Sequence, residues 1–177
     1  MRRLLRAPLA ALPVVGCMLV AVASAPGLAS TSGSERFDGG LVVSGASGKR
    51  TVVGSVIAMS GVFTGVGRIV ERPNKPGDSD KVDRDDLVFA AGTLHIKNTN
   101  GRASVAVNRR TCTVTFKVQK TTTVEGGTGR FAGATGRFAG AVSGSAVARH
   151  NTNGSCDQQH AALVEIDTVT GSGTLTF

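Results

Sequence analysis

The stretch TCTVTFKV, residues 111–118, alternates polar and apolar side chains residue by residue. Successive side chains of a β-strand point to opposite faces, so this alternation predicts a strand with one buried face. The face expected to be buried carries Cys112, Val114, Phe116 and Val118, and the other face carries threonines and Lys117. The prediction therefore places a cysteine in the apolar set.

Similar alternation, rich in Val and Thr, continues on both sides of this stretch, and no segment keeps a helical period. Asn98-Thr99-Asn100-Gly101 carries the Asn-Gly signal of a hairpin turn, and Gly171-Ser172-Gly173 is expected to interrupt the chain before its last strand. The further strands that we expect cover residues 36–44, two parts of 50–72 divided at Ser60-Gly61, and then 92–97, 102–108, 162–167 and 174–177.

These strands are joined by connections too short for parallel crossovers, which predicts antiparallel structure in a barrel or a sandwich. We favour the barrel, because closure removes the exposed edges of short Val/Thr strands. The expected fold is therefore all-β, a single closed antiparallel β-barrel of about eight strands over residues 35–177. Residues 30–34 are small and polar and are expected to form a disordered start, and longer loops are expected over 73–86 and 150–159.

The first 29 residues have the composition of a secretory signal peptide. Arg2, Arg3 and Arg6 precede an apolar run that leads to small residues, and we expect cleavage after Ala29, with Ala23 or Ala25 as alternatives. The alternative is lipid anchoring through Cys17, because Val14-Val15-Gly16-Cys17 resembles a lipobox. Both alternatives predict a protein outside the cytoplasm with no membrane-spanning helix after processing.

The chain carries a formal net charge of +8, which the loss of three signal arginines would reduce. This charge favours weak attraction to anionic surfaces, cell-wall polymers included. Nucleic acid is not an expected partner outside the cell, and the chain lacks Trp and Tyr for stacking on bases.

Cys112 and Cys156 form an even pair once Cys17 is removed with the signal. An oxidising compartment favours a structural disulfide between them, and no base or set of ligands nearby suggests a reactive thiol or a metal site.

The seven residues TGRFAGA occur twice in succession, over residues 128–134 and 135–141. Seven is odd and a strand has period two, so the two copies cannot share one straight strand with both phenylalanines on one face. We expect the first copy to form a turn or a single helical turn at the barrel rim and the second to begin a strand. Phe131 and Phe138 should then enter the core from different directions.

The segment around this repeat, from Gly126 to Gly136, resembles the G-G-T-G-x-[FY]-x-G-A-x-G segment of allene oxide cyclase-like and dirigent-like barrels, particularly small secreted ones from actinobacteria. Residues 85–94 and the pairs Thr111-Cys112 and Ser155-Cys156 are also similar to those proteins. The resemblance implies an eight-stranded antiparallel barrel with a rim motif of Gly127, Gly129, Phe131, Gly133 and Gly136. Some members cyclise or isomerise apolar substrates in the lumen, but this chain has no Tyr, and none of its residues matches a catalytic position.

Other motifs are weaker, and no cofactor or metal is expected. Gly127–Ala132 fits a loose dinucleotide fingerprint but no helix follows it. The acidic residues from Asp78 to Asp86 could attract Ca²⁺ but fail the EF-hand spacing, and a solvated loop is the preferred interpretation. His150, His160 and Asp157 would hold zinc only if their loop folded back, and no G-x-S-x-G elbow supports a serine nucleophile.

Arg68 and Glu71 are the candidate ligand-binding residues. They lie three residues apart in an apolar stretch, so a regular strand turns them to opposite faces and one of them should point into the lumen. A buried charge is costly unless it is paired, which makes this pair the first place to look for a site. The carboxylates of Glu125, Glu165 and Asp167 are expected on the surface, with Ala162, Val164 and Ile166 facing the other way.

The leading hypothesis is a secreted barrel of no assignable catalytic activity that binds an apolar small molecule or serves an extracellular interaction role. The alternatives are a lumenal cyclase or isomerase that resembles allene oxide cyclase, and a structural barrel filled by side chains. An open lumen with a partnered carboxylate or arginine favours the enzyme, and an open, wholly apolar lumen favours the binder. A filled lumen would leave only the outer surface for function.

Overall fold

The structure is a computed structural model that describes residues 30–157 and 159–177. The expected signal, its cleavage site and Cys17 lie outside the described residues. Among the residues that are described, no helix is long and apolar enough to cross a membrane.

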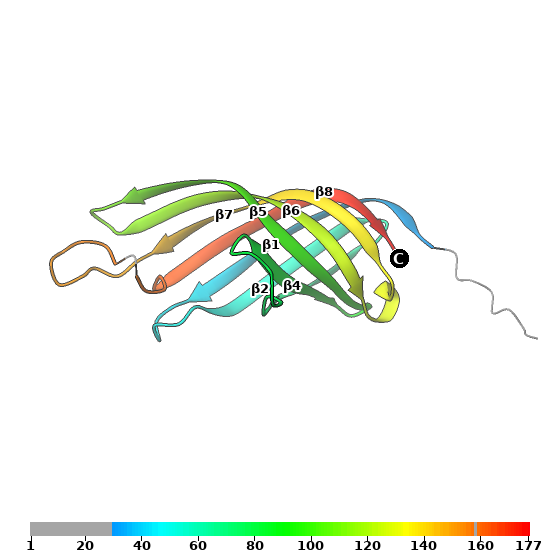
Figure 1. Ribbon diagram of the computed structural model, residues 1–177, viewed down its shortest axis with the longest axis horizontal. Helices are drawn as coiled ribbons and strands as arrows, with labels where there is room; N and C mark the ends of the chain where they lie inside the picture. Colours follow the sequence, from blue (N-terminus) through cyan, green and yellow to red (C-terminus); the bar gives the residue numbers. More distant parts are fainter. Residues whose placement is uncertain (1–29, 158) are drawn as a thin grey trace, which may run out of the picture.

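Eight antiparallel strands close into a barrel in simple sequence order, with β8 pairing to β1 (Figure 1). The all-β barrel expected from the alternation is confirmed. The elements are β1 (Ser32–Ser44), β2 (Thr51–Gly61), β3 (Gly65–Arg72), β4 (Val82–Phe89), β5 (Gly92–Asn108), β6 (Thr113–Gly127), the short 3₁₀ helix η1 (Gly129–Phe131), β7 (Thr135–Val147) and β8 (Val164–Thr176).

The number of strands matches the expectation, but their limits differ. The expected hairpin turn at Asn98–Gly101 is wrong, because β5 runs through it and pairs with β6 on both sides. The register shifts between Asn100 and Ala103, so the Asn-Gly pair lies beside a bulge rather than in a chain reversal. The expected break at Gly171–Gly173 is also wrong, because a side chain at Gly171 would overlap the ring of Phe37 and glycine makes room for it.

Two further limits are corrected. Ser32–Ser34 belong to β1, where they pair with Thr174–Thr176 and help to close the barrel, so the expected disordered start is wrong for these residues. The loop expected over residues 73–86 is shorter, because its last residues, 82–86, begin β4. The acids that alternate along this strand resemble a solvated loop in the sequence, so the sequence does not predict the strand.

The two ends of the barrel differ in shape. Strands β3 and β4 are short, whereas β5, β6 and β7 continue beyond them, so the wall on one side stops early (Figure 1). The opposite end carries the β2–β3 and β4–β5 turns and η1. We call the end with η1 the closed end and the end where β3 and β4 stop the open end.

Aromatic rings fill the closed end. Phe131 is fully buried, and its ring centroid lies 4.8 Å from that of Phe63, 5.4 Å from that of Phe177 and 5.9 Å from that of Phe89, all edge-to-face. Such pairs add to the stabilisation gained by burial alone. This cluster plugs the barrel and supports one end of its interior.

The repeated segment behaves as expected. Its first copy forms η1, and its second copy begins β7, so Phe131 and Phe138 reach the core from different elements and are both buried. Gly129 and Gly133 have φ values of 58° and 74°, which favour glycine and allow the tight reversal.

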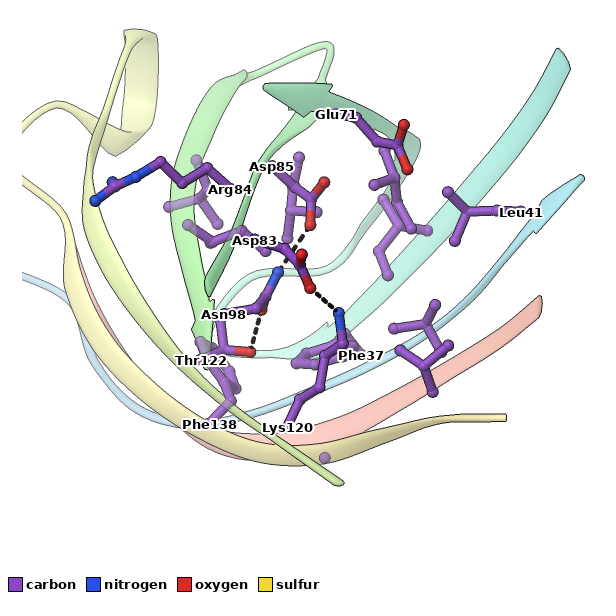
Figure 2. A pocket seen from close by; sticks show the side chains of 18 of the residues that line it. Phe37, Leu41, Glu71, Asp83, Arg84, Asp85, Asn98, Lys120, Thr122 and Phe138 are labelled. Carbon is purple, nitrogen blue, oxygen red and sulfur yellow. Dashed lines mark hydrogen bonds and ion pairs between the residues drawn. The ribbon is translucent and has the colours of Figure 1, made fainter. Parts of the chain in front are cut away.

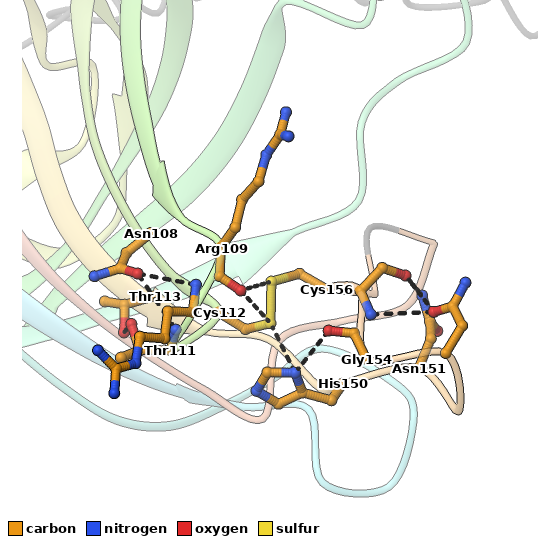
Figure 3. The surroundings of a disulfide bond; sticks show 12 residues. Asn108, Arg109, Thr111, Cys112, Thr113, His150, Asn151, Gly154 and Cys156 are labelled. Atoms are coloured by element: carbon orange, nitrogen blue, oxygen red, sulfur yellow. Dashed lines mark hydrogen bonds between the residues drawn. A yellow bond between two sulfur atoms is a disulfide. The ribbon is translucent and has the colours of Figure 1, made fainter.

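The Cys112–Cys156 disulfide is confirmed, with a Cα–Cα distance of 5.3 Å (Figure 3). Cys112 is buried as expected, but it lies in the β5–β6 turn with φ of 50° and not in the strand that follows. The bond joins this turn to the β7–β8 loop, where His150 Nδ1 lies 3.4 Å from the Cys112 sulfur. It therefore fastens the longest loop at the open end to the sheet.

Candidate functional site

A cavity of about 570 Å³ occupies the barrel between the phenylalanine plug and the open end. This volume falls within the range of small-molecule sites, roughly 300–1,000 Å³. The deeper part of its wall is apolar, and the side chains there include Phe37, Ile57, Met59, Ile69, Leu87, Leu94, Ile96, Val124 and Phe138. We call this part the floor.

The upper part of the wall is charged. Asp83 and Asp85 alternate with outward-facing residues along β4 and point over the cavity, together with Asn98 and Lys120 (Figure 2). Arg84, between the two acids, also borders the cavity, but its guanidinium extends away from Asp83 and Asp85 and pairs with Asp78 and Glu125 (Figure 2). The alternation that the sequence presents as an acidic loop therefore places two carboxylates in the lumen.

Asp85 is held by a short hydrogen-bonded chain. Asn98 Nδ2 donates to Asp85 Oδ2 at 2.7 Å, and the Thr122 hydroxyl donates to Asn98 Oδ1 at 2.6 Å (Figure 2). Asn98 and Thr122 are both buried and cannot easily rearrange. Burial, above all, raises the pKa of Asp85 to about 6, and the nearby carboxylates of Glu71 and Asp83 add to the rise. Asp85 is therefore an oriented carboxyl that exchanges its proton near neutral pH.

Asp167 faces the cavity from β8, on the opposite wall of the barrel. It is only 6% exposed, it lines the cavity, and its Oδ1 is buried without a hydrogen-bond partner among the described residues. Desolvation by burial raises its pKa to about 7, and repulsion from Glu165 acts in the same direction. This carboxyl is the least satisfied polar group in the cavity wall.

Arg50 spans the open end of the cavity. Its guanidinium pairs with Glu71 at the end of β3 and, at 3.3 Å, with Glu165 at the start of β8. Lys120 pairs with Asp83 at 2.8 Å. Arg72 and Arg84, which also border the cavity, pair with Asp86 and with Asp78 and Glu125. The cations at the cavity are thus matched with other carboxylates, and none of them pairs with Asp85 or Asp167.

Of the two candidate ligand-binding residues, Arg68 and Glu71, one lines the cavity and the other does not. Glu71 lines the cavity at its mouth, whereas Arg68 is exposed on the outer face of β3 and lines no part of it. The expected orientation of residues 162–167 is wrong. Glu165 and Asp167 face inward, and Val164 and Ile166 are exposed outside. Because β8 is continuous, the buried Leu175 sets the phase of the whole strand, and every second residue back to Glu165 shares its face.

The remaining residues of interest lie outside the lumen. The rim residues Gly127, Gly129 and Phe131 lie at the closed end and support the plug, while Gly136 lies in β7 beside β8. Glu125 is on the outer face, where it pairs with Arg84 and Lys75. Its position is that of the surface residue that we expected.

Metal-ligand geometry is not found in the described parts of the chain, where no group of three or more His, Cys, Asp or Glu is arranged to hold an ion. The Asp78 carboxylate pairs with Arg84, and this pairing lowers the pKa of Asp78 to about 2. The same ion pair joins the loop of residues 73–81 to β4. Asp157 accepts a hydrogen bond from His160, whereas His150 turns to the disulfide.

Comparisons of the chain with protein-family models, with curated proteins and with solved structures find no match. The site is therefore interpreted from its own geometry, which combines an apolar floor, a charged mouth and two carboxyls without a cation.

Proposed function

We propose that this chain is an extracytoplasmic binding protein that takes a small molecule with a largely apolar body into its barrel. The observation that carries the proposal is the open cavity above the phenylalanine plug, with its apolar floor and its polar mouth. An apolar body on the floor would leave water, and a polar end would meet the charged wall. This extends the expected apolar ligand to an amphipathic one.

A lumenal cyclase or isomerase is the second candidate, and a specific observation favours it. Asp85 is oriented by Asn98 and Thr122, and its pKa of about 6 suits a general base or acid near neutral pH. An open lumen with partnered carboxylates is also the arrangement that we associated with an enzyme. An eight-stranded antiparallel barrel is the fold implied by the resemblance to allene oxide cyclase-like and dirigent-like proteins, which supports this candidate.

Binding is tested with N-phenyl-1-naphthylamine, a neutral apolar probe whose fluorescence rises when it leaves water. We expect saturable binding of one probe per wild-type chain. Val169→Phe adds bulk to a residue that lines the cavity, and Val66→Phe makes the same change on the exposed outer face of β3. The first variant should lose most of the binding and the second should keep it.

Equal binding by both variants would contradict a lumenal site, and absence of saturable binding in the wild type would reject the proposed function. The two candidates are separated by incubating the protein with the compound that it retains and analysing that compound by mass spectrometry and chromatography. Conversion to an isomer that stops in Asp85→Asn, while probe binding continues, would favour the enzyme. Recovery of the compound unchanged would favour the binding protein.

Location outside the cytoplasm is part of the same proposal. The Cys112–Cys156 disulfide supports it, because such bonds persist in oxidising compartments. Mass spectrometry of the protein from the extracellular fraction, without reduction, should give a chain that begins at Ser30 and lacks two thiol hydrogens. A lipid-bearing chain that begins at Cys17 would support the anchored alternative, and reduced full-length protein confined to the cytoplasm would contradict both.

A further inference from the structure

Among the described residues, four carboxylates and four cations line the cavity. The carboxylates are those of Glu71, Asp83, Asp85 and Asp167, and the cations are those of Arg50, Arg72, Arg84 and Lys120. Each cation is already paired: Arg50 with Glu71 and Glu165, Arg72 with Asp86, Arg84 with Asp78 and Glu125, and Lys120 with Asp83. These pairs leave Asp85 and Asp167 without a cation.

Two of the four lining carboxyls thus lack a cationic partner. Neither Asp85 nor Asp167 has a Lys, Arg or His nitrogen within 4.0 Å in the part of the chain that the structure describes. Strands β4 and β8 lie four apart in a closed barrel of eight, so the two carboxyls stand on opposite walls. A cationic ligand would meet one or other of them wherever it entered above the floor.

Asp167 provides the more specific observation. Asp167 is only 6% exposed and lines the cavity, and its Oδ1, buried against Gly144 of β7, has no hydrogen-bond partner among the described residues. An unpaired buried carboxylate is costly, and a cation with N–H donors at this wall would compensate its charge and donate a hydrogen bond to it. A neutral ligand could donate a hydrogen bond but could not compensate the charge, and an anionic ligand would do neither.

We propose that the cavity selects amphipathic cations, namely alkylamines or arylalkylamines whose ammonium group is bound by Asp167 while the apolar body rests on the floor. Asp85 contributes negative potential from the opposite wall and offers a second anchor. This inference rests on the proposed function, since it names the chemical class that the binding site accepts. Arg50, Glu165 and Lys120 are the charged groups around Asp167, and the two cations oppose the selection only in part because they are already paired.

The test is competition against bound N-phenyl-1-naphthylamine at pH 7.5 by three ligands with the same chain: 1-octylamine, 1-octanol and octanoate. Octylammonium should displace the probe at the lowest concentration and octanoate at the highest. A charge-assisted hydrogen bond in a buried site predicts a preference of about tenfold for octylammonium over octanol. Asp167→Asn should remove most of this preference.

Asp38→Asn is the matched control, because Asp38 is exposed on the outer face of β1 and pairs with Arg36. It should keep the full preference, whereas loss in this variant would mean that overall charge and not the cavity selects the ligand. Equal displacement by octylammonium and octanol, or stronger displacement by octanoate, would overturn the cation inference and leave the proposed function intact. A probe that never binds would reject the proposed function itself.

If the preference persists in Asp167→Asn but is lost in Asp85→Asn, the anchor has been assigned to the wrong wall and the role of Asp167 is rejected. If both variants keep it, the cavity carboxylates do not recognise the cation. Circular dichroism of each variant checks that the barrel is retained.

Discussion

At the closed end of the barrel, the rings of Phe63, Phe89, Phe131 and Phe177 pack edge-to-face around a fully buried centre. At the open end, β3, β4, β6 and β8 carry carboxylates and cations toward a cavity, and Asp167 retains a buried oxygen without a partner among the described residues. Burial of apolar rings thus stabilises the closed end, while desolvation of charged groups destabilises the open end. The contrast teaches that the plug stabilises a barrel whose opposite end is left unsatisfied and free to bind.

The largest expected effect comes from opening the plug. Phe131→Ala should lower the free energy of unfolding by about 3–5 kcal/mol, because it removes a fully buried ring and leaves a cavity among three others. The matched change at the open end is Phe116→Ala, at a half-buried residue of β6, where we expect about 1–2 kcal/mol. Denaturant unfolding measures both, and equal losses would mean that stability is spread evenly between the ends.

The second largest effect is expected from the disulfide, which restrains the loops at the open end as ring packing restrains the closed end. Replacing Cys112 and Cys156 by Ser should lower the free energy of unfolding by about 2–4 kcal/mol, since the bond closes a long loop across a separation of 44 residues. The double variant is compared with oxidised wild type by denaturant unfolding. A loss below about 0.5 kcal/mol would show that the β7–β8 loop is restrained by its other contacts.

A gain in stability is expected when the buried charge of Asp167 at the open end is removed. The raised pKa of Asp167 means that the folded chain binds more protons than the unfolded chain between about pH 4 and pH 7, so wild-type stability falls as the pH rises through this window. Asp167→Asn lacks this fall and should be more stable by about 1–2 kcal/mol at pH 8, with little difference near pH 4. Unfolding at both pH values measures the gain, and Asp38→Asn, which retains Asp167, should lose stability between the two pH values as the wild type does.

The smallest effect on stability is expected for Arg50→Gln. The ion pairs of Arg50 with Glu71 and Glu165 lie at a partly exposed mouth, so their loss should change the free energy of unfolding by less than about 1 kcal/mol. Because the Arg50 guanidinium spans the opening, bound probe should dissociate from the variant faster than from the wild type, as measured by stopped-flow dilution. Unchanged dissociation would show that Arg50 does not restrict the mouth.

Much of the closed end could be predicted from sequence. The odd length of the TGRFAGA repeat forces a bend, which correctly placed η1 at the rim and Phe131 and Phe138 in the core. The disulfide also followed from two cysteines in an oxidising compartment. These predictions succeeded because they depend on local backbone geometry and on covalent chemistry.

The open end was harder to predict, because its wall breaks the rule that apolar side chains face inward. Asp83 and Asp85 looked like a solvated loop, and Glu165 and Asp167 looked like the outer face of a strand whose valine and isoleucine should be buried. The phase of β8 is set by Leu175, through a glycine pair that we interpreted as a break. The inward direction of these acids follows once residues 164–176 are taken as one strand that continues through its glycines.

The central claim is that an apolar ligand body lies inside the barrel on the floor of the cavity. It is tested most directly by intermolecular nuclear Overhauser effects between N-phenyl-1-naphthylamine and the methyl groups of the protein. We predict contacts with methyl groups of Ile57, Leu94 and Ile96, which line the cavity. Contacts confined to Val56, Val66 and Ile166, which are exposed on the outer face, would contradict the account.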